Sequence, residues 1–264
     1  MLIGVPPETD YDLRFSFLGI PVRVHPFFWL LSAILGWPLA SQDPKLMLIW
    51  MAAVFVSILV HEMGHALVIR YYGWSPSVIL YSFGGLATYN PGFRPVNSSY
   101  SRNGNTTLGQ IAISFAGPAA GFLLALIVAA SVIAAGYKLD LDLVIRTEAP
   151  PEPDLPPGTL VRLYTPLAFL ANALLWINIY WGILNLVPVY PLDGGKISRE
   201  ICLAVNSREG LKASMIISLI ASGCVALYAF KMGQPFLAIM FAMFGFSTYQ
   251  QLSGGNRYGG GRPW

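Results

Sequence analysis

The sequence predicts an α-helical polytopic membrane protein with about six transmembrane helices and a short membrane-associated β-hairpin. Hydrophobic residues make up 55% of the 264-residue chain and charged residues only 11%, against about 25% charged in an ordinary soluble domain. The apolar residues also gather in long runs, as expected where about 20 helical residues cross a bilayer. The net charge of +3 is small and dispersed, so no nucleic-acid partner is expected.

Six apolar runs define the expected spans: 25–41, 46–72, 111–136, 163–188, 213–230 and 235–252. Together they form a single membrane-embedded domain over residues 1–252, followed by a flexible Gly-rich tail at 253–264. The first run is short for a bilayer of about 30 Å. It opens at His25, which is interpreted as an interfacial histidine, with a ligand role as the alternative.

Two segments between the runs have a different character. Residues 76–90 contain two short apolar stretches around a Gly-Gly turn, which predicts a β-hairpin that dips into the membrane face or lies on the surface. Residues 15–24 also have strand-like character. The loop at 137–162 is rich in acids and prolines, so it is expected to be extended and solvated.

The most informative stretch is His61-Glu62-Met63-Gly64-His65, late in the second run. On a helix, His61 and His65 lie one turn apart on the same face, so both imidazoles can bind one ion. Glu62 lies about 100° round the helix from His61, close enough to hold a water on that ion. Buried in an apolar run, this pattern indicates a metal site rather than an accidental arrangement.

A second informative stretch, Asn185 to Gly195, ends the fourth run. Pro188 and Pro191 prevent a regular helix from continuing, so Asp193 is expected on irregular backbone at or just inside the membrane. Such backbone is tolerated only where protein buries it or where it lines a wet cavity. Asp193 and Glu62 are the two acids that fall within the runs or at their breaks.

The distribution of lysine and arginine predicts the orientation. Six spans place both termini on one side, and 11 of the 16 basic residues fall on that side. By the positive-inside rule the termini are therefore cytoplasmic, which fits a multi-pass protein of a cell (inner) membrane. The C-terminal ends of the second and fourth spans then reach the same depth, so His65 and Asp193 are expected at one site that opens toward the cytoplasm.

These residues predict a catalytic zinc ion. A catalytic zinc takes three protein ligands and leaves one position for water, and His61, His65 and Asp193 supply the three. Zinc lowers the pKa of its water to about 7, and Glu62 would accept the proton as general base and deliver it to a leaving amine. Asn185 presents an amide to the cavity, or else packs between helices.

A non-hydrolytic metal-binding membrane transporter is the alternative, because charged residues within a membrane often mark ion paths. The third, fifth and sixth runs contain few polar residues, which argues against a transport route. No oligomeric state is predicted.

The two motifs resemble the site-2 protease family (peptidase M50) of intramembrane zinc metalloproteases. The resemblance rests on His61-Glu62-x-x-His65 and on Asn185-x-x-Pro188-x-x-Pro191-Leu192-Asp193-Gly194, with further landmarks at Ser82-Phe83-Gly84-Gly85 and Ala116-Gly117-Pro118. It implies zinc-dependent cleavage of a peptide bond within or near a transmembrane segment of a membrane protein, as in regulated intramembrane proteolysis. It also implies that the hairpin offers an edge strand to unwound substrate.

The sequence departs from many members of that family. The loop at 137–162 is too short for the PDZ domain that others carry there, and no CBS domain follows residue 252. Gly121 stands where an asparagine often follows the Ala-Gly-Pro pattern. The chain is therefore expected to be a compact form, without the recruitment or regulation that those domains supply.

Overall fold

The computed structural model describes residues 7–40, 43–81, 84–89, 104–140, 145–148, 158–162 and 165–253. The predicted turn residues Ser82 and Phe83 and the Gly-rich tail from residue 254 lie outside this part of the chain. The chain divides into two compact units. The first comprises residues 1–102 and 116–182, and the second comprises residues 103–115 and 183–264.

A four-stranded sheet lies in the first unit, with the strand order β1-β2-β3-β4. Its strands are β1 (Leu13–Phe17), β2 (Ile20–Val24), β3 (Pro76–Tyr81) and β4 (Gly84–Tyr89). The predicted hairpin at 76–90 is the antiparallel β3–β4 pair, and β2 pairs with β3 in parallel. Leu18 and Gly19 both have positive φ, 50° and 72°, as a two-residue hairpin turn requires.

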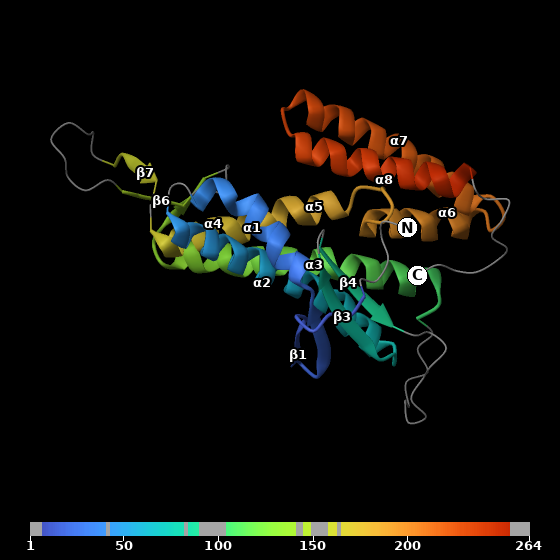
Figure 1. Ribbon diagram of the computed structural model, residues 1–264, viewed down its shortest axis with the longest axis horizontal. Coiled ribbons are helices and arrows are strands. Elements are labelled where there is room, and N and C mark those ends of the chain that lie inside the picture. Colours follow the sequence, from blue (N-terminus) through green and yellow to red (C-terminus); the bar gives the residue numbers. More distant parts are fainter. Residues whose placement is uncertain are drawn as a thin grey trace. The chain divides into compact units, whose positions relative to one another are not determined.

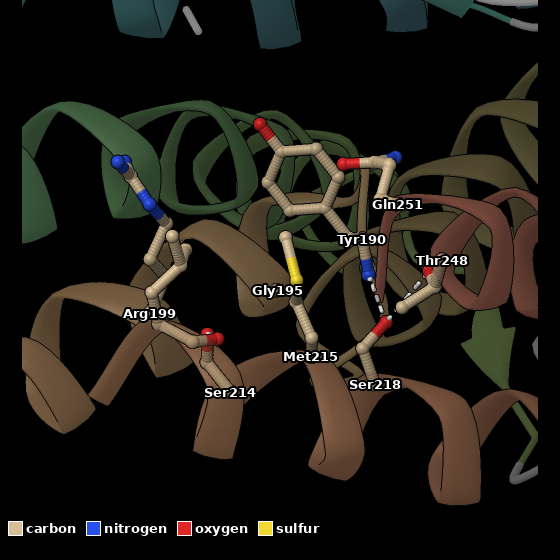
Figure 2. Close-up of a pocket in the computed structure, with 9 residues that line it drawn as sticks. Tyr190, Gly195, Arg199, Ser214, Met215, Ser218, Thr248 and Gln251 are labelled. Carbon is tan, nitrogen blue, oxygen red and sulfur yellow. Dashed lines mark hydrogen bonds between the residues drawn. The ribbon is translucent and has the colours of Figure 1, made fainter. Parts of the chain in front are cut away.

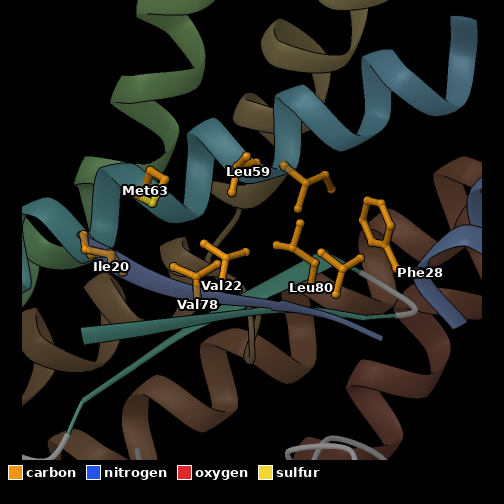
Figure 3. Close-up of a cluster of buried hydrophobic side chains, with 10 residues drawn as sticks. Ile20, Val22, Phe28, Leu59, Met63, Val78 and Leu80 are labelled. Atoms are coloured by element: carbon orange, nitrogen blue, oxygen red, sulfur yellow. The ribbon is translucent and has the colours of Figure 1, made fainter. Parts of the chain in front are cut away.

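The sheet packs against the helix that carries the histidine motif, α2 (Pro44–Tyr71) (Figures 1 and 3). Alternate residues of β2 and β3 point to this helix because successive strand side chains face opposite sides of a sheet. The buried cluster between them consists of Ile20, Val22, Val24, Phe28, Ile58, Leu59, Met63, Ala66, Val78 and Leu80. This cluster packs α2 against one face of the sheet.

Further helices surround α2 in the first unit. They are α1 (Pro26–Ala40), residues 116–134 of α3 (Thr107–Ala134), α4 (Pro166–Trp176) and the π-helical turn η1 (Ile177–Trp181). Ala173 and Ile177 pack on Ala53 of α2. His25 receives a hydrogen bond at Nδ1 from the backbone N of Phe27, so this buried histidine caps the start of α1.

The second unit contains α6 (Asp193–Val205), α7 (Gly210–Lys231), α8 (Pro235–Ser253) and the end of α5 (Gly182–Asn185). α7 and α8 lie side by side as an antiparallel pair (Figure 1). Val189, Met240 and Phe241 form the centre of the apolar core of the second unit. Gly245 of α8 faces the Ser222 hydroxyl of α7, so the two helices approach closely at a small residue.

The predicted helical membrane fold is confirmed, although the count of six spans is not. Among the described residues, four stretches are long and apolar enough to cross a bilayer: Pro44–Tyr71, Thr107–Ala134, Pro166–Asn185 and Gly210–Lys231. α1, predicted as the span 25–41, is a shorter apolar helix of 15 residues. α8, predicted as the span 235–252, has 19 residues and is not among those four stretches.

The segment expected to be extended, 137–162, contains strands. Described parts of it form a second sheet of order β5-β6-β7: β5 (Lys138–Leu139), β6 (Ile145–Glu148) and β7 (Leu160–Arg162). Thr147 lies opposite Val161 in this antiparallel arrangement. β-Branched residues favour a pleated strand, and Ile145, Thr147 and Val161 lie in these strands.

Asp12, which precedes β1, has a lowered pKa. Burial of its side chain raises the pKa, but hydrogen bonds from Thr9 and from the Arg23 guanidinium, at 2.9 Å, outweigh this effect and lower it from 3.8 to about 2. A carboxyl group with a lowered pKa stabilises the fold above its unfolded-state pKa, and the stabilisation is lost as the pH falls through the folded-state value.

We therefore expect Asp12→Asn to increase amide hydrogen exchange in β1 and β2 at about pH 6, where the wild-type carboxyl is charged. The difference between the two proteins should shrink as the pH falls from 3.8 to about 2. Glu8→Gln is the matched control, because Glu8 also pairs with an arginine but its side chain is 71% exposed. Equal protection of Asp12→Asn and wild type at about pH 6 would contradict this assignment.

Candidate metal centre and catalytic residues

The histidine pair lies on one face of α2, as its spacing predicts. His61 and His65 are both buried, and their Nε2 atoms lie 3.2 Å apart with the two rings nearly perpendicular, at 79°. Two nitrogens that bind one tetrahedral zinc at about 2.05 Å must lie about 3.3 Å apart. The pair therefore already has the separation that a shared zinc ion requires.

Gly117 of α3 lies directly against both imidazoles. A Cβ atom at this position would overlap His65 Nε2 and would lie 2.7 Å from His61 Nε2. At a neighbouring point of the same helix contact, Gly64 of α2 lies against the backbone of Ala116 and the side chain of Ala120. The small residues of the Ala-Gly-Pro stretch thus allow the close helix packing that the sequence indicates, and Gly117 also leaves space at the metal face.

Glu62 is 5% exposed and points to the sheet. A Cβ atom at Gly85, in β4, would overlap the Glu62 side chain and would lie 2.7 Å from its Oε1. The absence of a side chain at Gly85 therefore brings the β4 backbone against the carboxylate. The preceding residue, Gly84, lies near Trp181: a Cβ atom at Gly84 would be 4.0 Å from the Trp181 ring.

Asn185 and Asp193 lie in the second unit. Asn185 ends α5 and is 8% exposed, and Asp193 is the first residue of α6 and is 4% exposed. The Lys196 ammonium lies 3.0 Å from Asp193 Oδ1, one turn further along α6. The predicted break between α5 and α6 is present. Asp193, which was expected on irregular backbone, instead begins α6, where the helix dipole favours a negative charge.

The loop before Asp193 packs closely against the two glycines that follow this residue at the start of α6. A Cβ atom at Gly194 would overlap the Leu186 carbonyl, and one at Gly195 would lie 2.6 Å from the backbone at Val189 and Tyr190. Ser218 of α7 accepts a hydrogen bond from the backbone N of Tyr190 at 2.8 Å, and Thr248 of α8 lies 3.4 Å from the same hydroxyl (Figure 2). The two C-terminal helices therefore anchor the loop that carries Asp193.

Sequence reasoning identified His61, Glu62 and His65, which the first unit brings together. It missed the contacts of these residues with Gly85 and Gly117. It also missed two buried polar residues of the same unit, Ser57 and Asn178. Ser57 precedes His61 by one helical turn, and Asn178 is one of three asparagines, with Asn172 and Asn185, in an otherwise apolar run, so spacing and composition were the available signals.

Comparison with known proteins places the chain in a family. The model of peptidase family M50 matches residues 49–150 and 154–228, well over half of the chain. The chain belongs to peptidase family M50. The zinc metalloprotease MJ0392 of Methanocaldococcus jannaschii is similar to this chain, with 24% identity over 195 residues, covering 73% of this chain and 46% of the relative.

Two further proteins are similar to this chain. Stage IV sporulation protein FB of Bacillus subtilis is 24% identical over 241 residues, covering 89% of this chain and 67% of that protein. The solved site-2 protease of Methanocaldococcus jannaschii has the same fold, with a TM-score of 0.55 at 19% identity over 96% of this chain and 99% of that chain. The M50 chain spans about half the length of the first curated relatives that it matches.

Membership in family M50, together with four apolar helices of spanning length, identifies an integral membrane protein. The buried imidazole pair fits the nitrogen ligands that zinc prefers. A buried metal-binding motif in a membrane helix is costly unless an ion or a partner compensates its polar groups, so the motif favours a metal-binding function for α2.

Proposed function

We propose that this M50 protein is a zinc-dependent intramembrane endopeptidase of the site-2 protease type. It cleaves a peptide bond within or near a transmembrane segment of a membrane-protein substrate. The observation that carries the proposal is the buried His61-Glu62-x-x-His65 motif, within a helix of 28 residues that is apolar enough to cross a bilayer. The family and the fold support it.

Three buried side chains form the proposed ligand set for one zinc ion: His61, His65 and Asp193. The histidines supply two nitrogens at a suitable separation, 3.2 Å. Asp193 supplies a carboxylate oxygen, the common third ligand beside two histidines in zinc hydrolases. Bound there, zinc would polarise a substrate carbonyl and lower the pKa of its water.

Glu62 is the proposed general base. Its carboxylate Oε atom accepts a proton from the attacking water and then donates it to the nitrogen of the leaving amine. Asn185 is proposed to donate an amide N–H to the substrate carbonyl oxygen as negative charge develops on it. Both residues are more than nine-tenths buried, so little competing water would screen these interactions.

β4 is the proposed docking strand for the substrate. It is the outermost strand of its sheet in the described part of the chain, and its residues are half-buried. An extended peptide can add to such an edge through backbone hydrogen bonds. Because Gly85 of β4 lies against the Glu62 side chain, a strand paired there would pass close to the proposed base, and helical substrate would have to unwind first.

The basic residues favour an orientation with both termini in the cytoplasm of a cell (inner) membrane. In that orientation the site opens toward the cytoplasm, and cleavage would release a cytoplasmic segment. The lipid bilayer surrounds the apolar helices, and a membrane protein with a transmembrane segment is the proposed partner.

Zinc content is the direct test. Wild-type protein purified in detergent should contain about one zinc per chain, and His61→Ala, His65→Ala and Asp193→Ala should each lose most of it, because a site with two ligands binds zinc weakly. His25→Ala serves as the control, since this histidine caps α1. Wild-type protein without zinc, or retention of zinc in His65→Ala, would contradict the ligand assignment.

Cleavage is tested with single-span peptides that carry a fluorophore and a quencher, reconstituted with the protein in liposomes. Cleavage should require zinc and should be faster for a peptide with a central Gly-Pro pair than for the same peptide with leucines, because helix breakers ease unwinding. Zinc binding with no cleavage of any peptide, combined with ion flux across the liposome, would favour the transporter instead.

A further inference from the structure

We infer that Asn178 and Ser57 are positioning residues that set the rotation of the histidine face of α2. This inference rests on the proposed zinc function. The two side chains form a hydrogen-bonded contact, here called the Ser57–Asn178 bridge. It joins α2 to the π-helical turn η1 between residues that lie 121 positions apart in the sequence.

The bridge is buried and closely bonded. Asn178 is 4% exposed and Ser57 is 3% exposed. The Asn178 Nδ2 donates to the Ser57 Oγ at 2.8 Å and to the Leu174 carbonyl, one turn earlier in its own helix, also at 2.8 Å. The bond to Leu174 fixes the direction of the Asn178 amide. The bond from that fixed amide to Ser57 therefore constrains the orientation of α2 relative to η1.

The bridge lies on the same face of α2 as the metal ligands. Ser57, His61 and His65 are spaced four residues apart, which places them along one side of a helix. α3 faces this side with glycines at matching spacing. Gly117 lies against the imidazoles, and a Cβ atom at Gly121 would lie 3.2 Å from Asn178 Oδ1. The bridge therefore stands one helical turn from His61 within a continuous polar stripe.

Apolar packing alone leaves the rotation of such a helix weakly specified. In a bilayer, lipid is as apolar as the helix surface, so specificity between helices comes from close packing and from interhelical hydrogen bonds. A catalytic or metal site must be held within about 0.5 Å and 10–20°. A polar contact one turn from the ligands restrains the rotation of α2 where that tolerance matters.

The π-helical turn is the local feature that carries Asn178. η1 spans Ile177–Trp181 between α4 and α5, and π-turns within α-helices are rare and occur frequently at functional sites. Ile177, the neighbouring residue, packs on Ala53 of α2. The widened turn thus contacts α2 through an apolar and a polar residue, and only the polar contact has a defined direction.

The test compares Ser57→Ala with Ser32→Ala in the full-length protein. Ser32 is also 3% exposed and belongs to the same unit, but in the described part of the chain its hydroxyl bonds to the Phe28 carbonyl in its own helix and not to another helix. Loss of the outer support of a metal ligand commonly weakens metal binding about 10- to 100-fold. We expect zinc affinity, measured by chelator competition, to fall about 10-fold in Ser57→Ala and to stay at the wild-type value in Ser32→Ala.

Three further measurements separate positioning from general stability. The visible absorption bands of the cobalt-loaded protein should shift in Ser57→Ala and Asn178→Leu, because they report ligand geometry. In the cleavage assay, kcat should fall in Ser57→Ala while KM stays unchanged. Ser57→Thr, which keeps the hydroxyl, should restore the cobalt spectrum and kcat. Ser57→Ala and Ser32→Ala should unfold at similar temperatures, since each loses one hydroxyl.

The inference is overturned if wild type binds zinc and Ser57→Ala and Asn178→Leu bind it equally tightly with unchanged cobalt spectra. In that outcome the proposed protease function stands. If wild-type protein binds no zinc at all, the proposed function fails and the inference fails with it. Asn178→Leu gives an independent reading if Ser57→Ala is poorly produced.

Discussion

Replacing Glu62 with glutamine is expected to lower peptide cleavage at least about 100-fold while leaving the zinc content of the protein unchanged. Glutamine has nearly the same shape and fits the same buried space against Gly85. Its amide oxygen cannot take up a proton from water at neutral pH, so the general-base step is lost. Zinc is held by other residues in the proposed site, so binding of the ion and the substrate should persist.

This experiment measures initial cleavage rates of the quenched single-span peptide in liposomes, with zinc content determined on the same preparations. Glu62→Asp is the informative companion, because it keeps a carboxylate but shortens its reach by one methylene. We expect it to retain more activity than Glu62→Gln. If Glu62→Gln cleaved at a third of the wild-type rate or faster, Glu62 could not be the general base.

Gly117→Ala is expected to have an effect of similar size for a different reason. The added Cβ would overlap His65 Nε2 and would crowd His61 Nε2 at 2.7 Å, so the imidazoles or α3 must move. Displacement of reacting groups by about 1 Å can cost about 100-fold in rate. The expected result is a loss of zinc together with a loss of cleavage, in contrast to Glu62→Gln, which keeps its zinc.

Gly223→Ala is the matched control for this substitution. Gly223 also lies within a helix, α7, but a Cβ atom there would have no neighbour within 4 Å. Alanine has the higher helix propensity, by about 0.8–1.0 kcal/mol, so this variant should keep its zinc and its activity. Normal zinc affinity in Gly117→Ala would show that the imidazoles tolerate the methyl group, and that Gly117 is not needed to leave them space.

Local spacing predicted the histidine motif and its helix correctly. A four-residue interval on an α-helix places two side chains on one face whatever else surrounds them, so the proximity of His61 and His65 followed from the sequence. The helix break before Asp193 followed in the same way, because Pro188 and Pro191 cannot continue a helix. The β3–β4 hairpin was also predictable from two short apolar stretches, although the Gly-Gly pair expected in its turn forms the start of β4 instead.

Contacts between distant segments could not be read in this way. The parallel pairing of Val22 with Val78 joins strands separated by two helices, and no local pattern encodes that register. The role of Gly117 was seen only as packing, because its contact with the imidazoles depends on how α3 crosses α2. Six spans were predicted, but four stretches in the described residues are long and apolar enough to cross a bilayer. The boundaries of an apolar run do not fix the length of the helix that it forms.

The residues that would perform the chemistry were therefore recognisable from residue types and short intervals, since imidazole, carboxylate and helix-breaking properties belong to individual side chains and their near neighbours. The surroundings of those residues were not. Gly85 against Glu62, Gly117 against the histidines and Asn178 on Ser57 each join segments far apart in the chain. Such contacts arise from helix crossing and strand pairing, which depend on packing throughout the unit rather than on any one stretch of sequence.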